Sequence, residues 1–493
     1  MAAIYASEQE EEMFRSDSDE KGVGTINGQR GGNDAMTKER QAMARRILLK
    51  TDFRVLPILA LLFLCSFLDR TNVGNAKILG LETDLGLNDH QYHNGLTVFY
   101  ATYIASELPS NLVLKKVSPR IWLPAITVAW GIVAMCLGFV QNYAGFVIVR
   151  AFLGATEGGL LPGIVLYLSN MYTRGEMALR IGLFYTTASL SGAFGGLLAR
   201  GLSAIGTRGN LTGWRWIFTV VAGIIAYLLL PNGVDTASYL SPEERLHAAQ
   251  RLVDDKPAKD LDENGAVRKE SFQWSEVWRG ILSLQTWLSA SAYFGILSGL
   301  YSFGLFIPTI IQGMGYTANE AQLWSVIPYA VAAVLTVVVS IISDRLRLRG
   351  TIMLFTLLPA IIGYAVIANI SSSQVKYGMT FIMATGLYSG VPCILVWISN
   401  NSAGHYKRAT TTALQLAIAN CGGFVATFIY PDAEGPQFYR GHSVVLGLIV
   451  FAWFMVLFNV LYCAKINRDK AKGLYNRYAG YGDDRDPDFK MVL

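Results

Sequence analysis

Long apolar runs alternate with short polar breaks along almost the whole chain. Each run holds about 20 residues, which is enough for an α-helix to cross a hydrocarbon core of about 30 Å. The breaks are short except for the polar stretch 232–285, which separates six runs from six others. The pattern therefore predicts an all-α polytopic membrane protein with twelve transmembrane helices. The predicted spans are 53–74, 94–114, 121–140, 144–170, 180–202, 214–231, 286–312, 320–342, 351–370, 376–400, 409–430 and 443–464.

The composition agrees with a membrane protein. Only 16% of the 493 residues are charged, 52% are hydrophobic, and the mean hydropathy is +0.35. A soluble domain carries about 25% charged residues. The net charge of +5 is small and comes from basic residues that gather in the polar breaks, which differs from a nucleic-acid footprint. We therefore expect the lipid bilayer as a partner and no nucleic acid.

Basic residues in the polar breaks predict the topology. Positive charge collects on the cytoplasmic side of membrane proteins, and Arg45, Arg46 and Lys50 stand directly before the first span. We therefore expect both termini of a twelve-span protein in the cytoplasm, and the plasma membrane as its location. Most basic residues between later spans fall in breaks that this topology places inside: Lys115, Lys116, Arg120, Arg174, Arg180, Arg345, Arg347, Arg349, Lys407 and Arg408.

Composition also divides the chain into five segments. The first residues include EQEEE and SDSDE and almost no aromatic residues, which is typical of a disordered tail. Within the central break, Ser241 to Glu244 form a capping box that predicts a helix start, and 272–284 looks amphipathic. The segments are a disordered cytoplasmic N-terminal tail (1–50), an N-terminal six-helix bundle (51–231), a cytoplasmic central loop (232–285), a C-terminal six-helix bundle (286–465) and a cytoplasmic C-terminal tail (466–493).

The two groups of spans resemble each other at one constant offset of 230 residues. An internal repeat of six spans predicts two pseudo-symmetric six-helix bundles with a transport site between them at the middle of the membrane. The matching positions are Gly74 and Gly304, Pro162 and Pro392, Gly192 and Gly422, Phe194 and Phe424, and the runs 168–170 and 398–400.

The fourth span carries an arginine and a glutamate inside the apolar run VRAFLGATEGGLLPG at 149–163. Arg150 and Glu157 are seven residues apart and share one helix face. An ionisable group at membrane depth costs on the order of 2.5–3.5 kcal/mol, so the pair predicts a function, although an ion pair that locks two helices is the alternative. Gly154 and Gly158 are spaced to let a neighbouring helix approach closely.

The first span carries a second charged pair, Asp69 and Arg70, at a depth similar to that of Arg150. An arginine stays charged and presents a planar fork, so Arg70 and Arg150 are candidate clamps for a carboxylate. An apolar cavity favours the neutral form of an acid, so Asp69 and Glu157 are candidate proton carriers. Once protonated, these acids no longer compete with an anion for the arginines. Proton and anion binding therefore favour each other, which is the basis of symport.

Four segments resemble the anion:cation symporter family of the major facilitator superfamily, and among its members most of all the fungal allantoate, nicotinate and other vitamin or organic-acid permeases. The resemblance covers about residues 50 to 470. It implies that Arg70 and Arg150 bind the substrate carboxylate and that the acids beside them couple protons. The segments are DRTNVG at 69–74, RAFLGATEGGLLPG at 150–163, GWRWIF at 213–218 and SDR at 343–345.

The cytoplasmic loop motif of the superfamily is present in one half only. The second half keeps its aspartate as Asp344, followed by Arg345, whereas the first half reads Leu114-Lys115-Lys116 at the corresponding loop. These four charged residues are the gating candidates, and the difference predicts an asymmetric cytoplasmic gate.

Further polar and aromatic residues lie on spans that should line the cavity, where rings can stack on a planar substrate. Core packing is the alternative for each of them, because it is the commoner fate of an aromatic side chain in a membrane. The substrate-binding candidates besides the arginines are Asn72, Tyr185, Tyr293, Tyr301, Trp397, Asn400 and Asn420.

These features predict a secondary active transporter, which moves a small organic carboxylate such as nicotinate together with protons by alternating access. A permease for allantoate or another ureide or organic anion is the first alternative, and a nutrient-sensing receptor with a transporter fold is the second. The sequence has no cluster of metal ligands, nucleophile elbow or phosphate loop, so we expect no enzyme activity and no cofactor or metal. The proton gradient is the expected energy source, and we expect a monomer.

Overall fold

The computed structural model describes residues 30–117, 119–169, 171–172, 174–203, 215, 241–254, 274–481 and 483–493. Apart from Arg215, the predicted sixth span and the GWRWIF segment lie outside these residues, as does most of the central loop. The helices of the first half are α2 (Arg30–Ile78), α3 (Leu81–Leu85), α4 (Asp89–Lys116), α5 (Pro119–Leu137), α6 (Tyr143–Glu157), α7 (Leu160–Ser169) and α8 (Arg174–Ser203), followed by α10 (Pro242–Asp254) in the central loop. The remaining elements are α11 (Trp274–Ile281), α12 (Leu284–Gly313), α13 (Ala318–Leu346), α14 (Arg349–Asn369), α15 (Ser373–Asn400), α16 (His405–Asn420), α17 (Gly422–Phe428), η3 (Asp432–Glu434), α18 (Tyr439–Ala471) and η4 (Asn476–Tyr478).

The helices confirm the predicted spans wherever the chain is described. Every predicted span except the sixth coincides with helix, and no strand occurs in the described ranges. Nine of the described helical stretches are long and apolar enough to cross a membrane, and Ile121–Leu137 in α5 is a shorter apolar helix. Two spans are each divided in two: α6 gives way to α7 at Gly158–Gly159, and α16 gives way to α17 at Cys421.

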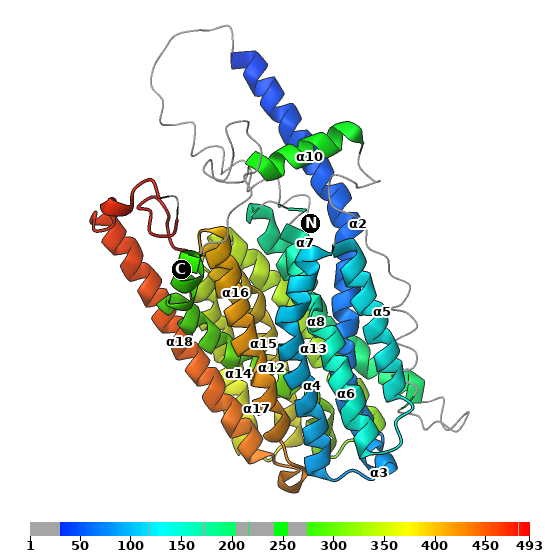
Figure 1. The fold of residues 1–493 in the computed structure, drawn as a ribbon. Helices are drawn as coiled ribbons and strands as arrows, with labels where there is room; N and C mark the ends of the chain where they lie inside the picture. Colours follow the sequence, from blue (N-terminus) through cyan, green and yellow to red (C-terminus); the bar gives the residue numbers. More distant parts are fainter. Residues whose placement is uncertain are drawn as a thin grey trace.

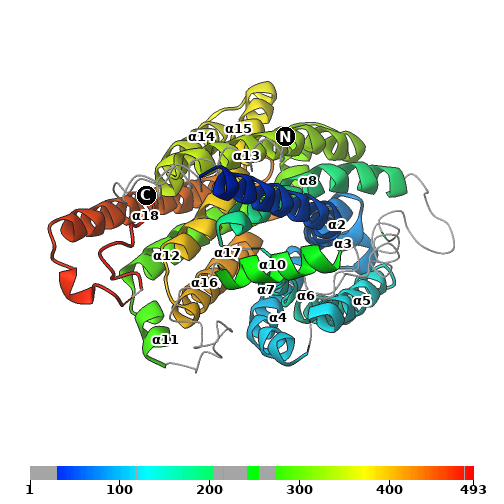
Figure 2. The same ribbon diagram turned by 90° about the horizontal axis from the view of Figure 1, so that it is seen from above.

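The helices form two bundles that lie side by side. Figure 1 shows the long helices running roughly along one axis with α10 lying across them, and Figure 2 shows α2 to α6 on one side and α12, α14 and α18 on the other. We call the end that carries α3 and η3 the outer end and the end that carries α10 and α11 the inner end, following the predicted topology. The bundles meet where α8 packs on α13, α2 on α12 and α4 on α17.

The matching glycines of the first and seventh spans lie at the contact between the halves. A Cβ atom at Gly74 in α2 would run into the carbonyl oxygen of Leu305 in α12, and Gly304 lies against Thr71. Only glycine at position 74 allows the two helix backbones to come this close, whereas an added Cβ at Gly304 would make an ordinary van der Waals contact.

The extended start of α2 corrects the prediction of a disordered tail for residues 30–50. These residues are helical, and Figure 1 shows α2 extending past the bundle beside α10. Lys50 Nζ lies 2.7 Å from both carboxylate oxygens of Glu244, and Arg46 lies 3.8 Å from it. The contact with α10 therefore stabilises a helix that composition alone did not predict. The capping box is confirmed, since Ser241 Oγ accepts a hydrogen bond from the Glu244 backbone N–H.

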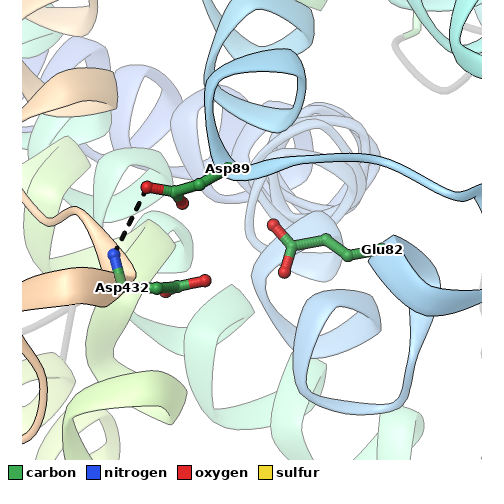
Figure 3. A group of neighbouring side chains, drawn as sticks. All are labelled: Glu82, Asp89 and Asp432. Carbon is green, nitrogen blue, oxygen red and sulfur yellow. Dashed lines mark hydrogen bonds between the residues drawn. The ribbon is translucent and has the colours of Figure 1, made fainter.

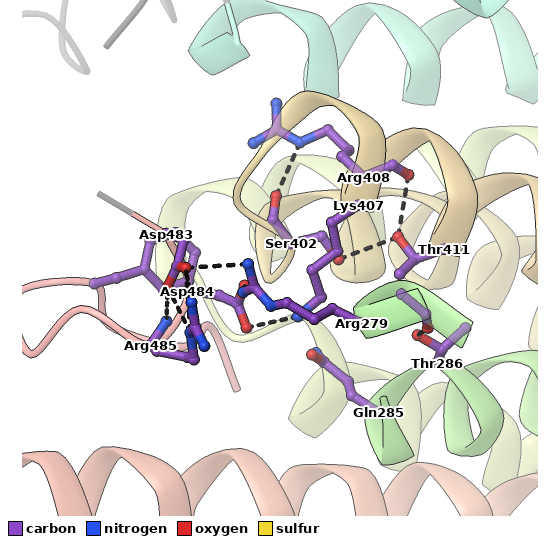
Figure 4. Close-up of polar contacts among 12 residues, drawn as sticks. Arg279, Gln285, Thr286, Ser402, Lys407, Arg408, Thr411, Asp483, Asp484 and Arg485 are labelled. Carbon is purple, nitrogen blue, oxygen red and sulfur yellow. Dashed lines mark hydrogen bonds and ion pairs between the residues drawn. The ribbon is translucent and has the colours of Figure 1, made fainter. Parts of the chain in front are cut away.

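The C-terminal segment folds back onto the inner end of the second half. Val492 accepts hydrogen bonds from Trp397 Nε1 and Asn401 Nδ2, both at 2.8 Å. Figure 4 shows Asp484 between Arg279 of α11 and Lys407 of α16, at 2.8 and 2.6 Å respectively. The predicted C-terminal tail is therefore a packed part of the second half after α18.

The predicted amphipathic segment forms α11. Trp274 and Trp278 are exposed, whereas Gly280 is buried against Thr410 of α16. One face of this helix thus packs on the bundle and the other presents tryptophans, which is the distribution expected for a helix at a membrane surface. Its location at that surface stays a prediction.

Candidate functional site

The helix α6 carries Arg150 and Glu157 into the interior of the first half. Asn142 caps its first turn by accepting a hydrogen bond from the Gly145 backbone N–H (2.9 Å). Gly154 and Gly158 face α4, where an added Cβ would run into the carbonyl oxygens of Phe99 and Tyr103. The predicted close approach of a neighbouring helix is confirmed. It brings the charged face of α6 against α2 and α4, and both charged side chains are 1% exposed.

Arg70 and Glu157 form a buried ion pair between α2 and α6. Arg70 Nε lies 2.7 Å from Glu157 Oε1, and the same oxygen accepts a hydrogen bond from Ser66 Oγ. The guanidinium also lies over the ring of Tyr103, 4.5 Å from its centroid. The glutamate is therefore paired with the arginine of another helix and not with the arginine of its own helix.

Arg150 is fully buried and has no hydrogen-bond partner on its Nε and Nη1 atoms in the described structure. Its guanidinium lies 4.5 Å from the centroid of the Phe99 ring. Near it, Asp69 Oδ2 accepts a hydrogen bond from Trp130 Nε1 (3.1 Å), while Asp69 Oδ1 has no hydrogen-bond partner among the described residues. Buried donors are almost always satisfied, so the unsatisfied guanidinium makes Arg150 a candidate for binding an anion.

A chain of hydrogen bonds extends from Arg70 into the second half and back. Arg70 Nη1 donates to the hydroxyl of Tyr301 on α12 (3.3 Å), which donates to Asn420 Oδ1 on α16 (2.9 Å). Asn420 Nδ2 then donates to Glu107 Oε2 on α4 (3.3 Å). The chain therefore connects an arginine and a carboxylate of the first half through two residues of the second half.

A small cavity lies beside Arg70 between the two halves. It measures about 10 Å³, which is about the least that holds one water molecule. Small-molecule pockets measure roughly 300–1,000 Å³, so this cavity is too small to hold a ligand of that kind. The cavity is largely aromatic and apolar, and it is lined by Phe67, Arg70, Thr71, Tyr100, Leu300, Tyr301, Gly304, Leu305 and Tyr388.

A sequence model of the Major Facilitator Superfamily matches residues 59–427. The chain belongs to the Major Facilitator Superfamily. It is 31% identical over 476 residues to the high-affinity nicotinic acid transporter of Saccharomyces cerevisiae, a match that covers 93% of this chain and 87% of that protein. It is 34% identical over 459 residues to an uncharacterised transporter of Schizosaccharomyces pombe, with 91% and 90% covered.

Solved structures of the superfamily share the fold. The xylose transporter XylE of E. coli, in a partially occluded inward open conformation, has a TM-score of 0.63 at 13% identity, with 81% of this chain and 97% of that chain covered. A bacterial homologue of the human lysosomal transporter Spinster has a TM-score of 0.58 at 15% identity, with 82% and 95% covered. This member of the superfamily is therefore a multi-pass membrane transporter of small molecules with two helical bundles, and not an enzyme.

The structure brings six of the transporter's predicted site residues together. These six are the four charged residues of α2 and α6 with Tyr301 and Asn420, described above. Tyr185 of α8 lies close by, with its ring 5.2 Å from that of Phe63, and it neighbours Tyr293 of α12. Asn72 is fully buried in α2, and its amide atoms have no partner in the described structure.

Other predicted residues of the transporter lie at its inner end. Trp397 is buried and donates to Val492 of the C-terminal segment, and Asn400 is half-buried at the last turn of α15. Asp344 pairs with Arg349 of the same half, and Arg345 is exposed. The side chains of the other two gating candidates, Lys115 and Lys116, lie outside the described residues.

Sequence reasoning missed Glu107, which lies in the predicted second span and is 8% exposed. The argument that identified Glu157, an acid inside an apolar run, would have found it as well. Ser66, Trp130 and Tyr100 were also missed. Nothing in the local sequence marks them, because their roles depend on which helices pack together.

A cluster of charged residues joins the two halves at the outer end. Lys77 Nζ at the end of α2 lies 2.8 Å from Asp432 of the second half and 3.3 Å and 3.6 Å from Glu82 and Asp89. Figure 3 shows the three carboxylates facing one another, with the Asp432 backbone N–H donating to Asp89. Burial holds the pKa of Glu82 above its usual range, and the ammonium of Lys77 opposes that shift. Three such carboxylates could hold a metal ion, but the ammonium already neutralises part of their charge.

Removing the charge of Lys77 is expected to loosen this outer contact. Lys77→Met removes the ion pair with Asp432, a half-exposed pair worth about 1 kcal/mol, so the open state should become roughly fivefold more populated. The hydroxyl of Thr427 lies 2.9 Å from that of Thr97 across the halves. A Thr427→Cys reporter, in a protein without native cysteines, should react about fivefold faster with an impermeant maleimide added outside.

The control for this experiment is Arg440→Met. Arg440 lies 3.9 Å from Glu434, and both belong to the second half, so its loss should leave the labelling rate unchanged. Equal labelling in the Lys77→Met protein and the unaltered reporter protein would contradict the role assigned to the cluster.

Proposed function

We propose that the protein is a proton-coupled symporter of a small organic carboxylate, nicotinate or a related acid, in the plasma membrane. The observation that carries the proposal is the buried guanidinium of Arg150, whose Nε and Nη1 have no partner in the described structure. A carboxylate presents two acceptor oxygens at the spacing of a guanidinium fork. Such a substrate would satisfy these donors at a depth where water cannot replace it.

The ion pair of Arg70 and Glu157 supplies the coupling to protons. While Glu157 is ionised it occupies Arg70 at 2.7 Å. A proton on Glu157 removes that competition and leaves Arg70 free to bind the substrate together with Arg150. Proton binding then raises the affinity for the anion, and by reciprocity the anion raises the affinity for the proton.

The aromatic residues near the arginines support a planar substrate. The rings of Tyr100 and Tyr301 lie 5.0 Å apart beside Arg70, one from each half. A ring that enters between them when the halves separate would stack on both faces. The similarity to a nicotinic acid transporter supports the same choice, since nicotinic acid is a ring carboxylate.

Uptake measurements test this function. Cells or proteoliposomes that contain the protein are expected to take up labelled nicotinate faster at pH 5 than at pH 7, and a protonophore should abolish accumulation. Labelled allantoate is the comparison for the ureide alternative. Uptake that is the same at both pH values and with or without the protonophore would contradict proton symport. Uptake of allantoate but not of nicotinate would contradict the preference for a ring carboxylate.

A further inference from the structure

Glu107 is a buried carboxyl group that the coupling scheme above does not use. It lies in α4, and its Oε2 accepts a hydrogen bond from Asn420 Nδ2 of the second half (3.3 Å). No cation of the described residues lies within ion-pair distance of it. Arg70, the arginine that acts on Glu107 electrostatically, is already paired with Glu157. An ionised carboxylate at membrane depth without a cation is costly, so this group has a reason to take up a proton.

The charges of the described core are unequal in number. Two arginines, Arg70 and Arg150, face three carboxyl groups, which are Asp69, Glu107 and Glu157. With all three acids ionised, the core carries one negative charge. A bound monocarboxylate adds a second negative charge. The loaded core is therefore neutral when it holds two protons.

Resting on the proposed symport function, we propose that Glu107 is a third proton-carrying carboxyl of the transport site and that each monocarboxylate enters with two protons. The loaded carrier is then neutral, and the empty carrier returns with one negative charge. Each cycle moves one positive charge inward. Uptake is therefore driven by an inside-negative membrane potential as well as by the pH gradient.

The hydrogen-bond chain gives the physical link between Glu107 and the substrate. Its donors all point from the arginine toward the acid: Arg70 to Tyr301, Tyr301 to Asn420, and Asn420 to Glu107. A positive charge at one end and an ionised acid at the other favour this polarity. Separation of the halves breaks the chain, because its two middle members belong to the second half. Glu107 then loses the amide that favours its ionised form and takes up a proton.

Four titratable groups lie around Glu107 in the described structure, each on a different part of the fold. They are Arg70 on α2, Tyr103 on α4, Tyr301 on α12 and Cys421 between α16 and α17. None of the last three carries charge near neutral pH at its ordinary pKa, and Arg70 is balanced by Glu157. The net charge of the empty carrier therefore depends on whether Glu107 is ionised.

Replacing Glu107 by glutamine tests the inference, because Gln keeps an oxygen that accepts from Asn420 but cannot titrate. Purified protein in proteoliposomes takes up labelled nicotinate under an imposed pH gradient or a potassium–valinomycin potential. In wild type, the ratio of nicotinate inside to outside should rise about 100-fold per pH unit and about a further tenfold per 59 mV of potential. In Glu107→Gln the same ratio should rise about tenfold per pH unit and should not change with the potential.

Two further variants separate titration from structure. Glu107→Asp keeps a titratable group and should retain the response to potential. Thr97→Val removes a hydrogen bond between the halves on the same helix and should leave the two-proton stoichiometry intact.

The outcomes distinguish this inference from the function on which it rests. Absence of protonophore-sensitive uptake in wild type would contradict the proposed function and this inference with it. Two results would contradict the inference alone. One is proton-coupled uptake in wild type that does not change with the membrane potential. The other is an equal response of uptake to the potential in wild type and Glu107→Gln. Loss of the response to potential in Thr97→Val would also overturn it, because a change without a titratable group would then have the same effect.

Discussion

Replacing Arg150 by alanine is expected to abolish uptake of the carboxylate substrate while the protein still folds. Nε and Nη1 of Arg150 have no partner in the described structure, so its removal breaks no hydrogen bond at these atoms. The variant loses a charge-assisted pair with the substrate, which is worth about 2–5 kcal/mol when buried. Binding should weaken by about 30-fold to several thousand-fold. Equilibrium binding of labelled nicotinate to purified protein measures the loss, and thermal unfolding checks the fold.

Two variants control this prediction. Arg150→Lys keeps the charge but not the planar fork, so it should bind more weakly than wild type and more tightly than Arg150→Ala. Lys376→Met removes another buried cation, whose Nζ contacts Gln437 at the outer end, and should leave substrate affinity unchanged. Affinity for nicotinate that is the same in Arg150→Ala and wild type would show that the substrate binds elsewhere.

Replacing Glu157 by glutamine is expected to separate substrate exchange from accumulation. Glutamine mimics the protonated acid, so it no longer holds Arg70 in an ion pair at 2.7 Å. The arginine is then free for the substrate at any pH. Exchange of labelled for unlabelled substrate across the membrane should persist, while uphill uptake and its stimulation by acid should weaken, because one proton-carrying group is lost. Counterflow and pH-driven uptake in the same proteoliposomes measure the two activities.

The alternative role of Glu157 predicts a different result. If its pairing with Arg70 only locks α2 to α6, the glutamine variant should lower the unfolding temperature and slow exchange and accumulation in the same proportion. The matched comparison is Ser66→Ala, which removes the second hydrogen bond to the same carboxylate oxygen without touching its charge. Normal acid-driven accumulation in Glu157→Gln would contradict its role in coupling.

The sequence predicted much of the architecture. The apolar runs located the spans because a helix must cover the whole hydrocarbon core with apolar residues. The offset of 230 residues matched Gly74 with Gly304, and both lie at the contact between α2 and α12. Residues 30–50 are helical where a disordered tail was predicted, and Lys50 and Arg46 lie beside Glu244 of a distant segment, a contact that the local sequence does not show.

The charged residues of the candidate site could be predicted from the sequence for a related reason. A charge in an apolar run stands out in the sequence, since it is costly at that depth and persists only with a function or a partner. The ion-pair partners of these residues could not be predicted from the sequence in the same way. Arg150 and Glu157 share a helix face, yet Glu157 pairs with Arg70, which is 87 residues away in the chain.

The sequence by itself determined that this protein is a two-bundle transporter with arginines and acids at membrane depth. Hydropathy and charge are properties of each residue and therefore follow from the sequence alone. Only the tertiary structure decided that Arg150 has unsatisfied donors, that Glu107 connects to Arg70 through Tyr301 and Asn420, and that Trp397 contacts the C-terminal segment. Those relations depend on how helices from distant parts of the chain pack, and hydrogen bonds act only at short range.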